Sequence, residues 1–510
     1  MKILDHTVSK SFLACLLFSF VLAALNFAFF VRTLDYQTIS YDDRRLTYEL
    51  EEAYNSKGII KTIFTNAVFL NSKHAYYRPI LPFSFFLDNM LGNGRTSMHI
   101  SHLTNVMLHI ACVLLLFIFC LKYCFGAFES FLIALIFSVS SFSAYSVAWL
   151  AGRNDLLLFL FTFLSFICFI ACNENSGYKK TALFLLHFVF FFLAFLSKET
   201  AVIIPAACMV FGCLKKYKFD FKALIIWVCI TAIFFFLRKN TGIGGSVFKY
   251  LFTPFVLKDN LYMIADFFSN AFMLSRDEIF PYIIKTPVLI AGYLAIVITA
   301  IAGRFSKNKK EALFFLGLAL VFLLPNFLIN RVHFQGNRMY MPFAFLIISV
   351  FYIVLSFART SKQKAVLTAA AFIFITMSAL RTNARMGVFY DDVSFFGNAV
   401  AQTPSAASLF ALGEAFVRRG DYEKAAVKFE EIEMTGQSWQ GLAINLASVN
   451  IHLGKYEKAG QIYEKYSHLF AHDKDYYEML IFCYSKSGNL GKAGEYEARL
   501  KELDLAAEKK

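Results

Sequence analysis

The sequence has few charged residues for its length. Asp, Glu, Lys and Arg make up 17% of its 510 residues, whereas soluble proteins carry about 25%. Hydrophobic residues account for 58%, with 62 Phe, and the mean hydropathy is +0.55. Because several apolar runs also approach about 20 residues, the composition excludes a soluble globular enzyme, a disordered chain and a collagen-like fibre. It predicts an all-α protein built as a polytopic bundle of transmembrane helices.

Metal-binding and redox motifs are also missing. No Cys-x-x-Cys pair occurs, and the ten cysteines fall in or beside apolar runs, with Cys483 as the exception. We expect these cysteines to be small buried apolar residues. The sequence therefore requires no cofactor and shows no metal site, although an acidic pair described below leaves room for a divalent cation.

The positive charge is unevenly distributed along the chain. The formal net charge is +14, but residues 401–510 hold 14 Lys and Arg against 16 Asp and Glu, a net of −2. Residues 1–400 therefore carry a net of +16. Since this is the apolar part of the chain, the basicity indicates membrane topology and argues against nucleic-acid binding.

The apolar runs predict about eleven spans. The first follows Lys2 and Lys10 and has no small-residue cleavage site after it, so we interpret it as a signal anchor. The predicted spans are 11–31, 99–121, 130–149, 156–172, 181–197, 200–214, 223–238, 287–303, 312–330, 339–357 and 365–381. The count of eleven requires both short runs between 181 and 214 to cross.

Loop charge predicts which side of the membrane each segment faces. With a cytoplasmic N-terminus, the inner loops contain 16 Lys and Arg against five acids, whereas the outer segments of 1–400 contain 20 against 15. This bias follows the positive-inside rule for short loops. The long segments 32–98, 239–286 and 382–510 are then all extracytoplasmic. No Asn-x-Ser/Thr site occurs, which favours a bacterial inner membrane over the endoplasmic reticulum.

The segment 401–510 contains an internal repeat of constant period. The residues that recur at equal spacing are Gly420, Gly454, Gly488, Ala425, Ala459 and Ala493. Their spacing matches the tetratricopeptide (TPR) repeat, in which Gly ends the first helix and the small Ala allows the two helices of a pair to approach closely. We predict a C-terminal TPR α-solenoid of three repeats after a membrane domain spanning 1–400. Such arrays usually bind peptides on a concave surface.

The first candidate for chemistry is an acidic pair about ten residues past the first span. Asp42 and Asp43 stand in the stretch 41–45, which reads YDDRR. Adjacent carboxylates repel each other, so one of them should hold a proton more readily unless a cation compensates. Either could act as a general base. The alternative is a solvated or helix-capping pair.

The second candidate group lies in the next span. His102, Asn105 and His109 share one helical face, and such polar groups should point into the bundle. Substrate binding and interhelical hydrogen bonding both remain open for this face. The set lacks a clear third metal ligand.

Further polar residues occur where other spans end. They lie in 152–155 (GRND), 197–199 (SKE) and 335–340 (QGNRMY). For a single loop the alternative is a turn with snorkelling charges. However, all these groups fall at the predicted outer face, and no charged residue lies in the middle of a clear span. A transporter would place charges near the midplane, whereas a lipid-linked substrate would present its headgroup at this face, where Arg and Lys could bind a phosphate.

These residues resemble a known family. The chain is similar to the GT-C superfamily of polyprenyl-phosphate-sugar glycosyltransferases, and in particular to the transmembrane and tetratricopeptide repeat (TMTC) O-mannosyltransferases and their bacterial relatives. The resemblance is carried by 41–45, 77–82 (YRPILP), 102–109, 147–156, 196–200 and 337–342, in this order and followed by the repeats.

The resemblance implies an inverting transfer of a sugar, often mannose, from a polyprenyl-phosphate donor to a hydroxyl of a protein or glycan acceptor. It makes Asp42 and Asp43 the catalytic candidates, one of them as the general base, and Arg338 the foremost phosphate contact. Glu199 is expected to pair with Lys198. The substrate-binding candidates are Arg78, His102, Asn105, Arg153, Asp155, Lys198, Glu199, Arg338 and Tyr340.

A different class of function remains open. The chain could be a non-catalytic membrane scaffold whose TPR repeats recruit partners. In that case the outer Asp and Arg residues would be dispensable, whereas residues 405–503 would not.

Overall fold

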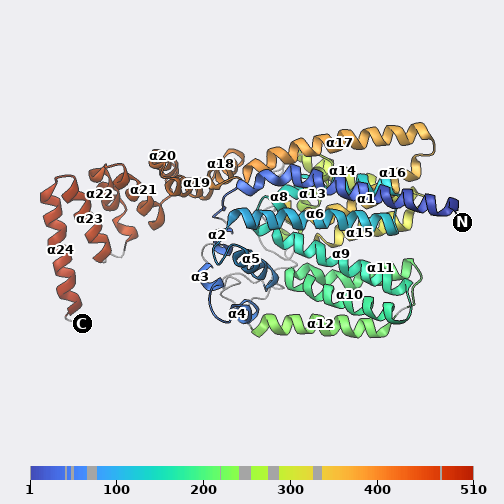
Figure 1. Cartoon of the computed structure of the whole chain (residues 1–510). Coiled ribbons are helices and arrows are strands. Elements are labelled where there is room, and N and C mark those ends of the chain that lie inside the picture. The colour runs from blue at the N-terminus through green and yellow to red at the C-terminus, as the bar shows by residue number, and fades with distance from the viewer. Residues whose placement is uncertain are drawn as a thin grey trace. The chain divides into compact units, whose positions relative to one another are not determined.

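The computed structural model consists of helices and their connections wherever it describes the chain (Figure 1), as the composition predicts. The described residues are 2–40, 43–47, 51–65, 77–218, 220–240, 254–273, 286–324, 336–470 and 474–508. The chain divides into two compact units, Met1–Asp391 and Asp392–Lys510. The sequence analysis expected this division near residue 400.

Over the described residues, eight helices are long and apolar enough to cross a membrane, so the protein is an integral multi-pass membrane protein. They are α1 (Lys2–Phe30, continued by η1, Val31–Asp35), α6 (Met98–Tyr123), α9 (Arg153–Glu174, preceded by η4, Leu150–Gly152), α10 (Gly177–Ser197), α12 (Phe221–Asn240), α14 (Thr286–Phe305), α16 (Tyr340–Phe357, preceded by η8, Gly336–Met339) and α17 (Ser361–Val388). A bent pair, α7 (Ala127–Ser138) with α8 (Ser141–Val147), forms a ninth span if it crosses as one.

The bend between α7 and α8 measures 62° and interrupts the run that the sequence predicted as one span. A broken helix frees backbone carbonyls, which need partners inside a membrane. The Nε2 of His109 donates to the carbonyl of Ser138 at 3.2 Å, and the hydroxyl of Thr382 donates to the carbonyl of Val139 at 2.7 Å. Side chains from neighbouring spans therefore supply hydrogen bonds to the carbonyls that the break leaves free.

Two of the eleven predicted runs do not form helices long enough to count as spans over the described residues. The run 200–214 forms η5 (Glu199–Ile203) and α11 (Ile204–Leu214), and the run 312–330 begins with α15 (Lys309–Val321), which has 13 residues. At about 1.5 Å per residue, α15 is roughly 20 Å long, short of a hydrocarbon core about 30 Å thick. Hydropathy alone does not register where a helix ends.

Short helices gather at one end of the membrane unit. These are α2 (Asp43–Leu46), α3 (Glu51–Tyr54), α4 (Ile59–Thr65) and α5 (Ile80–Leu91). A longer helix, α13 (Pro254–Ala271), packs against α14. The N-terminus and the α16–α17 connection lie at the opposite end from α2–α5 (Figure 1). The Lys- and Arg-rich connections and the predicted site residues are thus at opposite ends of the bundle.

The core of the membrane unit is centred on α6, α7, α9 and α16. The apolar window of α9 is 72% buried, whereas that of α17 is only 11% buried. Stacked phenylalanines fill the centre, with the ring centroids of Phe159 and Phe163 4.3 Å apart. Helix α17 is therefore a peripheral span with most of its apolar surface left for lipid.

The second unit consists of successive antiparallel helices. They are α18 (Asp392–Gln402), α19 (Ala406–Arg419), α20 (Tyr422–Glu433), α21 (Gln440–His452), α22 (Tyr456–Lys465), α23 (Lys474–Lys486) and α24 (Leu490–Glu508). Each helix from α18 to α24 packs against the next. Gly420, Gly454 and Gly488 follow α19, α21 and α23 with φ of 82°, 71° and 82°, which are the helix ends that the repeat predicts. Left-handed backbone at these positions favours glycine.

Cross-repeat ion pairs recur with the same period. Lys458 contacts Glu430 at 2.7 Å, and one repeat later Lys492 contacts Glu464 at 2.8 Å. The periodicity of the sequence therefore extends to side-chain contacts between helix pairs.

We predict that Gly420→Ala destabilises the α19–α20 pair by about 1 kcal/mol, because an L-residue at φ 82° is strained. Hydrogen exchange of the full-length protein should show faster exchange in these two helices. Gly397→Ala is the matched control, since Gly397 lies within α18 with open space at its Cβ position. Equal exchange in wild type and Gly420→Ala would contradict the prediction.

Candidate functional site

The candidate site is organised around the start of α9, where residues 151–155 contact several other segments. Ala151, Arg153 and Asp155 each hold a different part of this end of the bundle through the contacts described below. Gly152 lets the chain turn here, because a Cβ at this position would lie 2.4 Å from the Tyr145 carbonyl oxygen. The signal for this arrangement in the sequence is the stretch 152–155.

Asp43 is anchored to the start of α9. It begins α2 and is 1% exposed. Its Oδ1 accepts the backbone N–H of Ala151 at 2.9 Å, and its Oδ2 accepts that of Ile39 at 3.3 Å. Two amide donors stabilise an ionised carboxylate and fix its direction. The second catalytic candidate, Asp42, lies outside the described residues.

Arg153 is fully buried and bonded to the protein on several sides. Its Nε donates to Asn105 Oδ1 at 2.6 Å, and its Nη2 lies 2.7 Å from Asp88 Oδ2. The same guanidinium donates to the Ser101 carbonyl at 2.8 Å and to the Ser84 hydroxyl at 3.1 Å. These contacts tie α5 and α6 to α9. Substrate binding by Arg153 and Asn105 stays a prediction from the sequence.

Asp88 is the partner of Arg153 and was not among the candidate residues predicted from the sequence. Asp88 is the lone carboxylate in α5, whose other residues are apolar or uncharged, and it is 4% exposed. An isolated acid in such a helix predicts a buried cation opposite it. That signal was present in the sequence, but the partner lies beyond the whole of α6, α7 and α8 and could not be identified from it.

Asp155 faces away from Arg153 and joins two other segments. Lys198 Nζ donates to its Oδ1 at 2.6 Å, and Asn337 Nδ2 donates to its Oδ2 at 2.7 Å. Burial lowers the pKa of Lys198 to about 8; Asp155 opposes this shift, and the nearby positive charges of Arg78 and Arg338 add to it. Three of the predicted phosphate contacts, Arg78, Lys198 and Arg338, therefore lie in one electrostatic neighbourhood.

The expected pairing of Glu199 with Lys198 is wrong. Glu199 Oε2 accepts from Arg78 Nε at 2.9 Å and Nη2 at 2.8 Å. Lys198 has extended backbone, with φ −161° and ψ 139°, so adjacent side chains diverge. Each of these neighbouring residues consequently binds a different element.

The histidine face of α6 is buried, as its polarity predicts. His109 Nε2 donates to the Ser138 carbonyl, so its Nδ1 accepts from the Tyr340 hydroxyl, at 2.7 Å. The amide of Asn105 donates to the carbonyl of Trp149 at 3.4 Å. His102 is fully buried, and neither of its ring nitrogens has a hydrogen-bond partner among the described residues.

No group of three His, Cys, Asp or Glu side chains suited to a metal ion occurs within the described ranges. The contacts of Asp43 and Asp155 include hydrogen bonds from two backbone amides, an ammonium and a side-chain amide.

We predict that Lys198 makes stability depend on alkaline pH. Its pKa is about 8 in the folded protein and 10.5 ordinarily, so between these values the unfolded chain binds more protons. Stability should rise with pH in this window, by up to about 1.4 kcal/mol per pH unit. The melting temperature of wild type, measured against Lys198→Met, should therefore increase from pH 8 to 10.5. Parallel curves would contradict the lowered pKa of the buried Lys198, whereas Lys180→Met, at an exposed lysine, should leave the slope unchanged.

Comparison with known proteins gives the chain its relatives. It is 28% identical over 163 residues to protein O-mannosyl-transferase TMTC2 of Mus musculus, covering 31% of this chain and 19% of that protein. It is 21% identical over 431 residues to TMTC4 of Mus musculus, covering 70% of this chain and 58% of that protein. This chain is related to the TMTC protein O-mannosyl-transferases. The resemblance predicted from the sequence is therefore confirmed.

The chain matches only part of each relative. It spans between 19% and 58% of the curated relatives named above. No family model matches it. Among solved structures, it is similar to ArnT from Cupriavidus metallidurans bound to undecaprenyl phosphate, with a TM-score of 0.44, 14% identity, and coverage of 89% of this chain and 81% of that chain.

Proposed function

We propose that the protein is a membrane glycosyltransferase that moves a sugar, mannose in the first instance, from a polyprenyl-phosphate donor to a hydroxyl of a protein acceptor. The observation that carries this proposal is the start of α9, which holds the anchored carboxylate of Asp43 on one side and the Asp155–Lys198 pair on the other. The similar TMTC proteins are protein O-mannosyl-transferases, which supports the same reaction.

In this proposal Asp43 is the general base. It removes the proton of the acceptor hydroxyl as the oxygen bonds to the anomeric carbon, and the bond from that carbon to the lipid phosphate breaks with inversion. The leaving phosphate gains negative charge, which cations must stabilise. The positive charge comes from Arg338, Arg78 and Lys198. Glu199 holds Arg78 in place, and Asp155 holds Lys198 in place.

Arg153 then has a positioning role. Its bonds to Asp88 and Asn105 fix α5 and α6 against the segment that carries Asp43. Tyr340 is held by His109 and would orient η8, on which Arg338 lies. The sequence predicted both Arg153 and Tyr340 as substrate contacts, and this proposal gives them positioning roles.

The second unit would present the acceptor. We propose that its helix pairs are the three TPR repeats predicted from the sequence, on the non-cytoplasmic side of the membrane. The glycine-ended helices and the ion pairs that recur once per repeat support this assignment.

The test is to incubate the purified full-length protein with a panel of polyprenyl-phosphate sugars and acceptor peptides. We expect release of polyprenyl phosphate together with glycosylated peptide for at least one donor, and loss of both in Arg338→Ala. If folded protein releases no lipid phosphate with any donor, while deletion of 405–503 abolishes partner capture, the scaffold alternative is favoured.

A further inference from the structure

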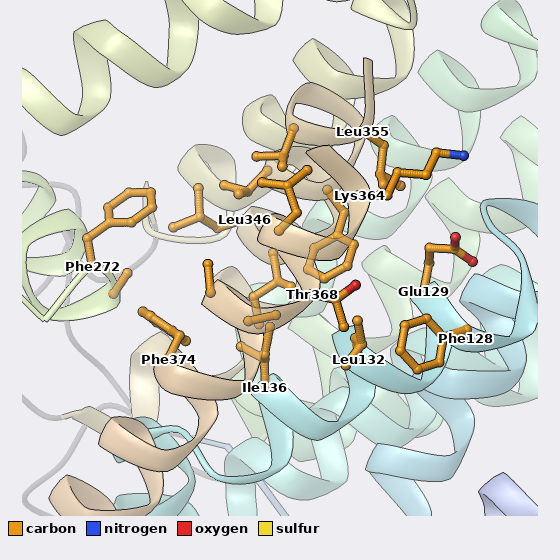
Figure 2. Close-up of a pocket in the computed structure, with 18 of the residues that line it drawn as sticks. Phe128, Glu129, Leu132, Ile136, Phe272, Leu346, Leu355, Lys364, Thr368 and Phe374 are labelled. Carbon is orange, nitrogen blue, oxygen red and sulfur yellow. The ribbon is translucent and has the colours of Figure 1, made fainter. Parts of the chain in front are cut away.

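An apolar pocket lies between α7, α13, α16 and α17 in the membrane unit (Figure 2). Its volume is about 280 Å³. Leu132 and Ile136 of α7, Leu346 of α16 and Phe374 of α17 are among the apolar residues that line it. The pocket is thus built from helices that are far apart in the sequence.

The two charged residues of the pocket lie together at one end. Figure 2 shows Lys364 and Glu129 at this end, and Phe272 and Phe374 at the other. Lys364 belongs to the first turn of α17 and Glu129 to the first turn of α7, where each chain enters its span. The pocket therefore has one positive and one negative side chain at one end and an apolar interior.

Helix α17, which lines one side of the pocket, exposes an apolar surface. Only 11% of the apolar window of α17 is buried in the protein, and Ile373 and Leu380 on that helix are 62% and 67% exposed. Surfaces of this kind on a span face lipid. An empty apolar pocket loses dispersion contacts along its lining, and water would find few polar partners inside. A hydrocarbon chain is the occupant that matches the interior.

We propose that the pocket holds an acyl chain of a bilayer phospholipid whose headgroup carries both a phosphate and an ammonium group. Lys364 binds the phosphate, and Glu129 accepts hydrogen bonds from the ammonium. A headgroup with negative charge alone would use Lys364 but would place its charge against Glu129. From Lys364 to Phe374, α17 rises about 15 Å, roughly half the hydrocarbon thickness, which suits a chain from a single leaflet.

This lipid site is distinct from the one that the proposed reaction uses. Lys364 stands next to the α16–α17 connection, at the opposite end of the bundle from α2, which carries Asp43 (Figure 1). A donor headgroup beside Asp43 and a phospholipid headgroup beside Lys364 would lie in opposite leaflets. The lipid site therefore holds whether or not the transfer reaction is as proposed.

Native mass spectrometry of the full-length protein tests this assignment. Delipidated protein is titrated with phosphatidylethanolamine and with phosphatidylglycerol of identical acyl chains. We expect wild type to bind phosphatidylethanolamine about tenfold more tightly, as one charge-assisted hydrogen bond allows. Lys364→Ala should weaken the binding of both lipids. Glu129→Gln should remove only the preference for phosphatidylethanolamine, and Ala371→Trp should block the pocket to both.

Two matched controls share the helix but not the pocket. Lys362→Ala removes a neighbouring lysine, and Ile373→Trp adds the same bulk on a side chain that is 62% exposed; both should bind like wild type. Equal binding by wild type, Lys364→Ala and Ala371→Trp would overturn the site. Tighter binding of a polyprenyl phosphate than of either phospholipid, lost in the same variants, would also overturn it.

Discussion

Replacing Asp43 by Asn should reduce sugar transfer by about 10²- to 10⁴-fold, the usual contribution of a general base. The amide has nearly the same shape as the carboxylate and can still accept the N–H of Ala151, but it cannot take a proton from the acceptor. The loss should appear in the rate of product formation at saturating donor, with little change in donor binding. The measurement is the rate of polyprenyl-phosphate release at several donor concentrations.

The control for this substitution is Asp35→Asn. Asp35 is an exposed carboxylate in η1, eight residues before Asp43, and its replacement should leave the rate unchanged. Melting curves of both variants show whether each remains folded. Wild-type rates in Asp43→Asn, in Asp42→Asn and in the double variant would remove the proposed base altogether.

Replacing Arg153 by Met should destabilise the membrane unit by about 3–5 kcal/mol, because Asp88 would remain as a buried charge without its partner. Both side chains of this pair are nearly inaccessible, at 0% and 5% exposure. Methionine preserves much of the length of the side chain and its packing over the ring of Phe85, whose centroid lies 3.9 Å from the guanidinium carbon. The midpoint of thermal unfolding should fall sharply.

Two further variants separate charge from packing. Arg153→Met combined with Asp88→Leu removes both charges and should recover part of the lost stability. Arg499→Met breaks an ion pair whose side chains are both 53% exposed, and exposed pairs contribute little. If Arg153→Met melts at the wild-type temperature, the buried pair does not hold these helices together.

The sequence predicted the fold class and most of the helix positions because hydropathy and the repeat period can be read from the chain without knowing its fold. Its candidate residues Asp43, Arg153, Asp155 and Lys198 are brought together in the structure, and their role in substrate binding or catalysis stays a prediction. The sequence could not predict pairings over long separations, such as that of Asp155 with Asn337. The partner of Glu199 was misassigned for the same reason, since neighbours in sequence were assumed to be neighbours in space.

The bend between α7 and α8 could not be predicted for a different reason. The run 130–149 is predominantly apolar, yet the chain breaks between Ser138 and Ser141 and bends by 62°. The break is stabilised by donors from His109 and Thr382, which lie on other spans. Hydropathy cannot show such a break, because the donors that stabilise it come from distant parts of the chain.

The central claim is that the chemistry takes place at the non-cytoplasmic end of the bundle. The end of α17 is tied to the site end, because Gln37 N–H donates to the carbonyl of Tyr390 at 2.9 Å, just past the end of α17. The side reached by a tag fused after Lys510 therefore reports the side of Asp43. Impermeant protease added to right-side-out vesicles should remove the tag, and protease added to inverted vesicles should not. Removal only from the inverted vesicles would contradict the account.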